Sequence, residues 1–268
     1  MPASGGEAAA GIRYVRDGHV ARVTIDRPQV LNAIDPPAAA RLERIWEQVE
    51  ADGDVRAVVL TGAGERAFCV GADLSAAADQ PTGVERWSRA NPNGFAGLTL
   101  RRSLDVPVIA RVNGYALGGG LELVLGCDIV VAAEHAQFGF PEPRVGGLPS
   151  EGGVLRLTRW LPHQQAMGML LTGRRLGARE LERVGLVNEA VAPKQLDEAV
   201  ERWTADVLAC APLALRAIKQ MAAQTSDLPL HAAHRTLVPA LLRTFNSEDG
   251  KEGVAAFREK RPPNWRGR

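Results

Sequence analysis

The sequence predicts an α/β protein with a helical C-terminal part. Short apolar runs rich in β-branched residues, which are typical of buried strands, recur through the first two thirds of the chain and alternate with segments of helical spacing. From His163 onwards the periodic segments are largely helical. We therefore expect a tail over residues 1–10, a core over residues 11–195 and a helical layer over residues 196–268.

Composition limits the functional class. The chain has 268 residues, of which 46% are hydrophobic, so it can bury a sizeable core, and its net charge of +1 predicts neither a nucleic-acid partner nor a membrane surface. No apolar run reaches the length of about 18 residues that a membrane span needs. Cys69, Cys127 and Cys210 are widely spaced in apolar segments. We interpret them as reduced core thiols, which predicts a cytoplasmic location and neither a disulfide framework nor a metal site.

The first elements are predicted from turn and capping residues. Asp17-Gly18 is a strong hairpin signal between two strands, over residues 12–16 and 19–25. Asp35 is typical of a helix N-cap, and the proline that follows it favours a helix over residues 36–51.

A glycine-rich segment after the next predicted strand imitates a dinucleotide-binding fingerprint. Residues 62–67 have the spacing G-x-G-x-x-A and follow the strand predicted over residues 55–61. A true fingerprint begins a helix and is followed, about 20 residues later, by an acidic residue. Here residues 67–70 return to extended apolar chain and residues 80–83 form a loop. We therefore do not expect a nicotinamide cofactor.

The same two periodicities predict the remaining elements. We expect strands over residues 106–112, 128–133, 136–139 and 187–191. We expect helices over residues 98–104, 154–161, 163–171, 178–184, 196–207, 212–223, 229–245 and 248–257. Residues 75–97 are polar and weakly periodic, which predicts a short helix and a loop of the kind that often contacts substrate.

The most informative stretch is Val112-Asn113-Gly114-Tyr115-Ala116-Leu117-Gly118-Gly119-Gly120-Leu121-Glu122-Leu123. It predicts a buried strand, a glycine-rich turn and a helix with a carboxylate in its first turn. A helix N-terminus has unpaired N–H groups that stabilise an anion or an oxygen that becomes negative in a reaction, and Glu122 beside it can transfer a proton. The alternative is a tight turn with an exposed Glu122, but the apolar flanks place the turn near the core.

Two other segments could contribute to the same chemistry. In Gly71-Ala72-Asp73-Leu74, Asp73 suits the start of a helix, so the Ala72 N–H could point into a cavity; an ordinary capped turn is the alternative. Glu142 lies between two prolines, which makes it either a surface charge or a carboxylate held in a preset position.

Together these motifs resemble the crotonase (enoyl-CoA hydratase/isomerase) superfamily. The resemblance depends on the order and spacing of Ala67-Phe68-Cys69-Val70-Gly71-Ala72-Asp73-Leu74, the stretch around Gly118 to Gly120, Phe138-Gly139-Phe140-Pro141-Glu142-Pro143, and the ending Phe257-Arg258-Glu259-Lys260-Arg261-Pro262-Pro263. It implies a spiral of ββα units with two nearly perpendicular sheets, followed by a C-terminal helical layer that forms trimers or hexamers. The ending and residues 152–157 are particularly similar to the carnitinyl-CoA dehydratase branch.

The resemblance also implies a set of site residues. The backbone N–H groups of Ala72 and Gly119 correspond to an oxyanion hole for the carbonyl of an acyl-CoA thioester, and Glu122 and Glu142 to the catalytic pair of the hydratases. Phe257 and Lys260 would close over the nucleotide, in the same subunit or a neighbouring one, although a solvated charge run explains Lys260 equally well. The full set of implied substrate-binding residues is Val30, Leu31, Ala33, Ala67, Gly71, Asp73, Leu74, Gly118, Pro141, Phe257 and Lys260.

We therefore expect a hydratase that adds water across the 2,3 double bond of an enoyl-CoA thioester, with no metal or redox cofactor beyond the coenzyme A of the substrate. The alternatives are a carnitinyl-CoA dehydratase, a double-bond isomerase or, from another class, a non-catalytic acyl-CoA-binding scaffold. Ser150-Glu151 departs from the small residues of many hydratases. We expect Glu151 to cap the following helix, although it could act as a third acid or base or contact a polar acyl group. The role of Arg144 is similarly open.

Overall fold

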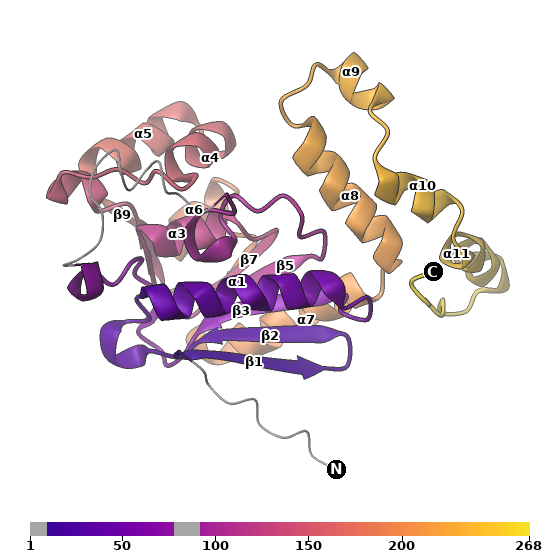
Figure 1. The fold of residues 1–268 in the computed structure, drawn as a ribbon, viewed down its shortest axis with the longest axis horizontal. Helices are drawn as coiled ribbons and strands as arrows, with labels where there is room; N and C mark the ends of the chain where they lie inside the picture. Colours follow the sequence, from indigo (N-terminus) through magenta and orange to yellow (C-terminus); the bar gives the residue numbers. More distant parts are fainter. Residues whose placement is uncertain (1–9, 78–91) are drawn as a thin grey trace, which may run out of the picture.

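The fold consists of two β-sheets, a layer of helices packed on them and a set of C-terminal helices that extends to one side (Figure 1). It was analysed in a computed structural model, in which residues 10–77 and 92–268 are described. Most of the predicted tail and the predicted loop at residues 80–83 lie outside these ranges.

Within the described residues, ten strands form the two sheets. The six-stranded sheet has the order β1-β2-β3-β5-β7-β10, in which only the β1–β2 pair is antiparallel. Its strands are β1 (Ile12–Asp17), β2 (Val20–Ile25), β3 (Ala57–Gly62), β5 (Val108–Val112), β7 (Ile129–Ala133) and β10 (Glu189–Val191). The four-stranded sheet has the order β4-β6-β8-β9, with an antiparallel β8–β9 pair. Its strands are β4 (Ala67–Cys69), β6 (Tyr115–Leu117), β8 (Gln137–Gly139) and β9 (Arg175–Gly177).

The helices fall into two groups. Those around the sheets are α1 (Pro36–Ala51), α3 (Gly119–Leu125), α4 (Gly153–Trp160), α5 (His163–Thr172), α6 (Ala178–Arg183) and α7 (Leu196–Leu208). Those that extend to the side in Figure 1 are α8 (Pro212–Thr225), α9 (Leu230–Arg235), α10 (Pro239–Phe245) and α11 (Glu248–Glu259). Short 3-10 turns are η1 (Pro28–Val30), η2 (Leu74–Ala77), η3 (Phe95–Gly97), η4 (Glu142–Val145) and η5 (Pro193–Gln195).

The two faces of the six-stranded sheet pack against different helices. Along β3, Val58 and Leu60 belong to the main core with α1 and α3, whereas Ala57 and Val59 pack with apolar residues of α7. This alternation follows from the period of two in a β-strand. Helix α7 therefore covers the sheet, and the helices that extend to the side in Figure 1 begin with α8.

Several local predictions are confirmed. The β1–β2 hairpin forms around the predicted turn. The Asp35 side chain accepts a hydrogen bond of 2.9 Å from the Ala38 N–H and caps α1. After Gly64 the chain enters strand β4 instead of a helix, as expected for a segment that only imitates a dinucleotide fingerprint.

Other local predictions are wrong. Residues 98–104 are irregular rather than helical, because the turn before them has positive φ angles at Gly94, Ala96 and Gly97. The predicted helix over residues 229–245 is two helices, since Pro239 has no N–H and disfavours helical geometry at the residue before it. Cys210 is exposed at the end of α7, so only Cys69 and Cys127 are core thiols. Strands β6 and β9 were not predicted as separate elements.

Candidate active site

The glycine-rich turn between β6 and α3 is shaped by close contacts. Gly118 has φ 55° and ψ −130°, a conformation that strains other residues, and a Cβ there would lie 2.9 Å from Glu142 Oε1. A Cβ at Gly120 would lie 1.9 Å from the Cys69 carbonyl oxygen. Glycine at both positions therefore brings the first turn of α3 against strand β4 and against Glu142.

The segment that carries Ala72 lies beside this helix N-terminus. A Cβ at Gly71 would be 3.0 Å from the Gly119 nitrogen, and Gly71 has φ 95°. Ile34 donates to the Gly71 carbonyl and accepts from the Asp73 N–H, each at 2.9 Å, so the Ala72 N–H faces away from Ile34. Within residues 10–77 and 92–268, neither the Ala72 nor the Gly119 N–H donates to a backbone carbonyl. Two free donors thus lie on adjoining segments.

Arg27 joins the two segments for which substrate binding was predicted. Its guanidinium donates to the Ala33 carbonyl at 2.5 Å and forms ion pairs with Asp35 at 2.8 Å and Asp73 at 3.2 Å. Leu31 and its neighbour have φ angles of 53° and 59°, an uncommon conformation for residues other than glycine. The loop over residues 30–33 is thereby held next to residues 71–74.

Asn32 connects the same loop to strand β4. Its side chain is fully buried, and its Nδ2 donates to the carbonyls of Ala63 at 3.0 Å and Ala67 at 2.7 Å. Its Oδ1 accepts from the Arg27 N–H at 3.0 Å. The predicted residues Val30, Leu31, Ala33, Ala67, Gly71, Asp73 and Leu74 consequently occupy one continuous region.

Glu122 is a buried carboxyl in the first turn of α3. Only 4% of its surface is exposed, and its Oε1 accepts a hydrogen bond of 2.9 Å from the Gly153 N–H at the start of α4. The pKa of Glu122 is raised to about 7, chiefly by burial and in smaller part by the negative charges of Glu142 and Glu151. Such a group exchanges its proton near neutral pH.

Glu142 stands on η4, directly after Pro141. Burial raises the pKa of this carboxyl as well, against the lowering effect of its own backbone N–H. Its Oε2 is buried and accepts no hydrogen bond from the described residues, whereas its Oε1 faces Gly118. A buried carboxylate oxygen without a protein donor is suited to hold water or substrate. Because its charge raises the pKa of Glu122, the two carboxyls lie within electrostatic reach of each other.

Comparison with known proteins identifies the family of the chain. The profile of the family described as Enoyl-CoA hydratase/isomerase matches residues 16–268. The chain belongs to the enoyl-CoA hydratase/isomerase family. It is 41% identical over 261 residues to a carnitinyl-CoA dehydratase from Escherichia coli strain K12, an alignment that covers 96% of this chain and 98% of the relative.

Solved structures of the family confirm the predicted crotonase-like fold. An enoyl-CoA hydratase subunit I from Geobacillus kaustophilus superposes with a TM-score of 0.88 at 37% identity, covering 98% of this chain and 100% of that one. An enoyl-CoA hydratase from Mycobacterium tuberculosis superposes with a TM-score of 0.87 at 32% identity, covering 97% and 100%.

Two ambiguous residues near the site are placed by the structure. Gly152, rather than Glu151, is the N-cap residue of α4, so the predicted N-cap position of Glu151 is wrong. The charge of Glu151 raises the pKa of Glu122, so this carboxylate lies near the predicted acid/base pair. Arg144 is exposed and donates to the Thr172 carbonyl at 3.0 Å, so it ties η4 to the end of α5.

The structure does not bring Phe257 and Lys260 to the site of their own chain. Phe257 is 85% exposed on α11, and Lys260 ends that helix with φ 55°. In Figure 1 this helix lies on the opposite side of the molecule from α3. Any contact of these two residues with substrate therefore requires another copy of the chain.

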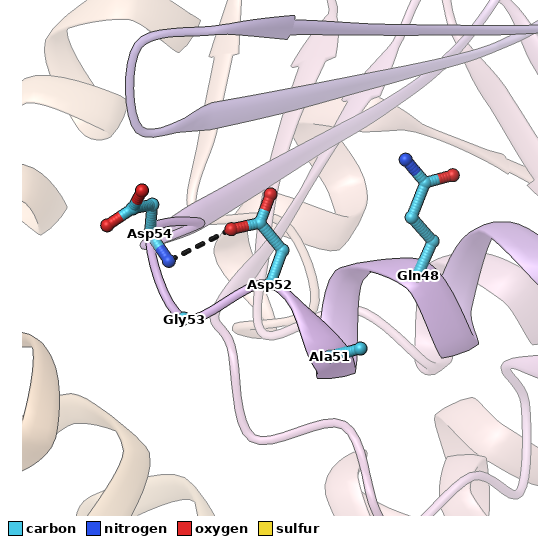
Figure 2. A pocket seen from close by; sticks show the side chains of 5 residues that line it. All are labelled: Gln48, Ala51, Asp52, Gly53 and Asp54. Carbon is cyan, nitrogen blue, oxygen red and sulfur yellow. Dashed lines mark hydrogen bonds between the residues drawn. The ribbon is translucent and has the colours of Figure 1, made fainter.

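An open depression elsewhere is a weaker candidate. It lies at the C-terminal end of α1 and is lined by Gln48, Ala51, Asp52, Gly53 and Asp54 (Figure 2). Arg16 pairs with the carboxylates of Asp52 at 2.8 Å and Asp54 at 3.2 Å. Asp52 also accepts from the Asp54 N–H at 3.0 Å, as Figure 2 shows. These acids stabilise a turn, and the depression lies away from α3 in Figure 1.

Sequence reasoning missed residues that build the site without reacting. Arg27 and Asn32 hold the loop over residues 30–33, Gly153 donates to Glu122, and the Phe95 ring lies on Gly119. The pair of glycines before α4 was the only available signal for Gly153. The contact of Phe95 with Gly119 spans 24 positions of sequence and had no local signal.

Proposed function

We propose that this enzyme reversibly adds water across the 2,3 double bond of an enoyl-CoA thioester. The observation that supports this most is the buried carboxyl of Glu122 near the half-buried carboxyl of Glu142, whose charge raises the pKa of Glu122. Beside them lie the N–H groups of Ala72 and Gly119, which donate to no backbone carbonyl of the described residues. An N–H pair stabilises a developing oxyanion and two carboxyls can move the two protons of a hydration. Membership of the family supports the same reaction.

The amides would hold the thioester carbonyl. As water attacks C3, negative charge moves through C2 to the thioester oxygen, and fixed N–H donors stabilise that oxygen more in the transition state than in the substrate. One donor of this kind typically contributes about 10² to 10³ in rate. The neighbouring contact between Gly71 and the Gly119 nitrogen supports a shared target for the two donors.

The carboxyls would divide the two proton transfers. One carboxylate takes a proton from the attacking water as its oxygen bonds to C3, and the other, protonated, carboxyl gives a proton to C2. This requires the pair to hold one proton at the start. The pKa of both Glu122 and Glu142 is raised, which supports retention of a proton by the pair near pH 7. The steps involve no metal or redox cofactor, and coenzyme A enters as part of the substrate.

A carnitinyl-CoA dehydratase is the second candidate. The curated relatives at 41% identity carry that name, whereas the solved hydratases described above are 32% and 37% identical. The reaction type is the same, and the two candidates differ in the acyl group.

Hydration is tested by incubating the enzyme with crotonyl-CoA and measuring the loss of the ultraviolet absorbance of the conjugated thioester. The same assay with crotonobetainyl-CoA separates the two candidates, because each predicts faster conversion of its own substrate. Movement of the double bond in a 3-enoyl-CoA would favour an isomerase. Binding of an acyl-CoA without any turnover would favour a non-catalytic scaffold.

Assembly into a homotrimer or hexamer is part of the proposal. The C-terminal helices expose large apolar side chains that a monomer would leave in water, which supports burial against other copies. These side chains are Ile218, Leu228, Leu230, Leu237, Leu242, Phe245 and Val254. Light scattering coupled to gel filtration would give the mass of the assembly, and a monomer at micromolar concentration would contradict it.

Membrane and nucleic-acid partners are not part of the proposal. None of the helices described is long and apolar enough to cross a bilayer, and the net charge of +1 supports no polyanionic partner. The cytoplasmic location inferred from the cysteines stays a prediction.

A further inference from the structure

Phe95 lies on the peptide group that carries one of the two proposed oxyanion donors. A Cβ built on Gly119 would be 2.8 Å from Phe95 Cε1 and 2.9 Å from Cδ1, so the ring rests on this glycine. The ring is partly buried against the main core. Its position explains why residue 119 has no side chain, and it places an aromatic wall next to the proposed seat of the thioester carbonyl.

The turn that carries Phe95 is held firmly. Gly94, Ala96 and Gly97 have φ angles of 73°, 53° and 71°, which define a tight turn. The Phe95 N–H donates to Thr99 Oγ1 at 2.8 Å, and Trp46 Nε1 donates to the Ala96 carbonyl at 2.9 Å. These hydrogen bonds thus fix the position of the Phe95 ring relative to the first turn of α3.

A buried ion cluster fixes the base of the same turn to α1. The Arg101 side chain is 3% exposed and pairs with Glu43 at 2.7 Å and Glu50 at 2.6 Å. It also donates to the Gly97 carbonyl at 3.3 Å. Because the turn is anchored on two sides, the Phe95 ring cannot retreat from Gly119 without breaking these contacts. A ring held in this way can reject a ligand group by contact.

We propose that Phe95 is a specificity-determining residue that selects acyl groups unbranched at C2. The inference depends on the function proposed above, because it places the thioester oxygen at the Gly119 N–H. The carbonyl carbon bonded to that oxygen also carries C2 and the thioester sulfur, so the ring lies nearer to these atoms than to the far end of the acyl chain. We place C2 on the side of the ring, because the proposed reaction requires C2 within reach of Glu122, in the first turn of α3. A methyl group on C2 would meet the ring, whereas a linear chain would pass it.

The test compares two unreactive thioesters that differ by one C2 methyl group, butyryl-CoA and 2-methylbutyryl-CoA, by isothermal titration calorimetry on the full-length protein. We expect the wild type to bind butyryl-CoA about tenfold or more tightly than 2-methylbutyryl-CoA, the range for one methylene group in a tight pocket. In Phe95→Ala the ratio should fall to about two or less, and Phe95→Leu should lie between, because the space freed grows as the side chain shrinks. Affinity for butyryl-CoA should change little in either variant.

The outcomes separate the two proposals. An unchanged affinity ratio in Phe95→Ala, or equal losses for both thioesters, would contradict the role of Phe95. If Phe95→Ala does not fold, as judged by its melting temperature, the ratio in Phe95→Leu decides instead. If butyryl-CoA binds but crotonyl-CoA is not hydrated, the proposed reaction fails while the selectivity is still measured. If neither thioester binds the wild type, both proposals fail.

Discussion

Glu122 and Glu252 are the same residue type in opposite environments. Glu122 is buried at the start of α3 and forms no salt bridge with any described residue, and burial raises its pKa to about 7. Glu252, on α11, accepts from the Arg261 guanidinium at 2.6 and 2.9 Å and from the Asn264 N–H at 2.7 Å, which lowers its pKa to about 2. In the C-terminal region the Glu252 carboxylate is ionised and stabilises the last segment of the chain through hydrogen bonds. Near α3 the Glu122 carboxyl is able to exchange a proton near neutral pH.

The largest expected contrast between these regions is in activity. Glu122→Gln and Glu142→Gln should each lower kcat for crotonyl-CoA hydration by about 10³, because a positioned acid or base contributes roughly 10² to 10⁴. The double variant should be little slower than either single variant, since the two act as a unit. The matched change Glu252→Gln should keep kcat within about twofold. If Glu252→Gln lowered kcat as much as Glu122→Gln does, the proposed difference between the two regions would be contradicted.

A second contrast concerns packing. Gly120→Ala should destabilise the protein by about 3 kcal/mol, because the new Cβ would meet the Cys69 carbonyl oxygen at 1.9 Å and backbone must move. The free energy of unfolding in urea measures this. Gly168→Ala on α5 is the control, since a Cβ there meets nothing within 4 Å, and it should stabilise by roughly 0.5–1 kcal/mol. Equal effects of the two substitutions would show that α3 is not packed as described.

The raised pKa of Glu122 has a consequence for stability. Its pKa is about 7 in the folded protein and 4.5 for an unperturbed glutamate, as in the unfolded chain. The folded state therefore binds more protons between these limits, and stability falls as pH rises through that window. The wild type should lose up to about 3 kcal/mol from this group between pH 4.5 and 7. Glu122→Gln lacks this loss, so its unfolding free energy relative to wild type should rise over the same interval. A relative stability that does not vary with pH would mean that Glu122 titrates normally.

The smallest expected effect concerns the support of the Ala72 segment. Arg27→Lys keeps the charge but cannot contact Ala33, Asp35 and Asp73 together, because an ammonium lacks the planar fork of a guanidinium. We expect kcat/KM to fall about tenfold, with most of the loss in kcat, as the proposed amide donor becomes less well positioned. Arg261→Lys, in the C-terminal region, should leave kcat/KM unchanged. A loss confined to KM would mean that Arg27 serves only coenzyme A binding.

The parts of the fold that could be predicted are those that depend on motifs of a few neighbouring residues. Asp35 before Pro36 identified the start of α1, and the three glycines before Glu122 identified the turn into α3. The separate strand β6 and the irregular residues 98–104 were missed, since they depend on pairing with β4 and on the Arg101 ion cluster. The candidate site residues were predicted as a set only through the resemblance to the family.

The supporting residues could not be predicted because their partners lie far away in the sequence. Phe95 contacts Gly119, Arg27 contacts Asp73, and Gly153 contacts Glu122. Each of these contacts exists only after the sheets have formed. The roles of Phe257 and Lys260 stay a prediction, since α11 lies away from α3 in the same chain and the prediction also allowed a neighbouring subunit.

The central claim is that Glu122 carries a proton near neutral pH because it is buried without a compensating cation contact. A ¹³C NMR titration of the side-chain carboxyls of the glutamate-labelled enzyme tests it directly, with Glu122→Gln to assign the signal. The account predicts a resonance that titrates near pH 7 and is absent in the variant, while the Glu252 carboxyl stays ionised down to a pH of about 2. Titration of every glutamate below pH 5 would contradict it.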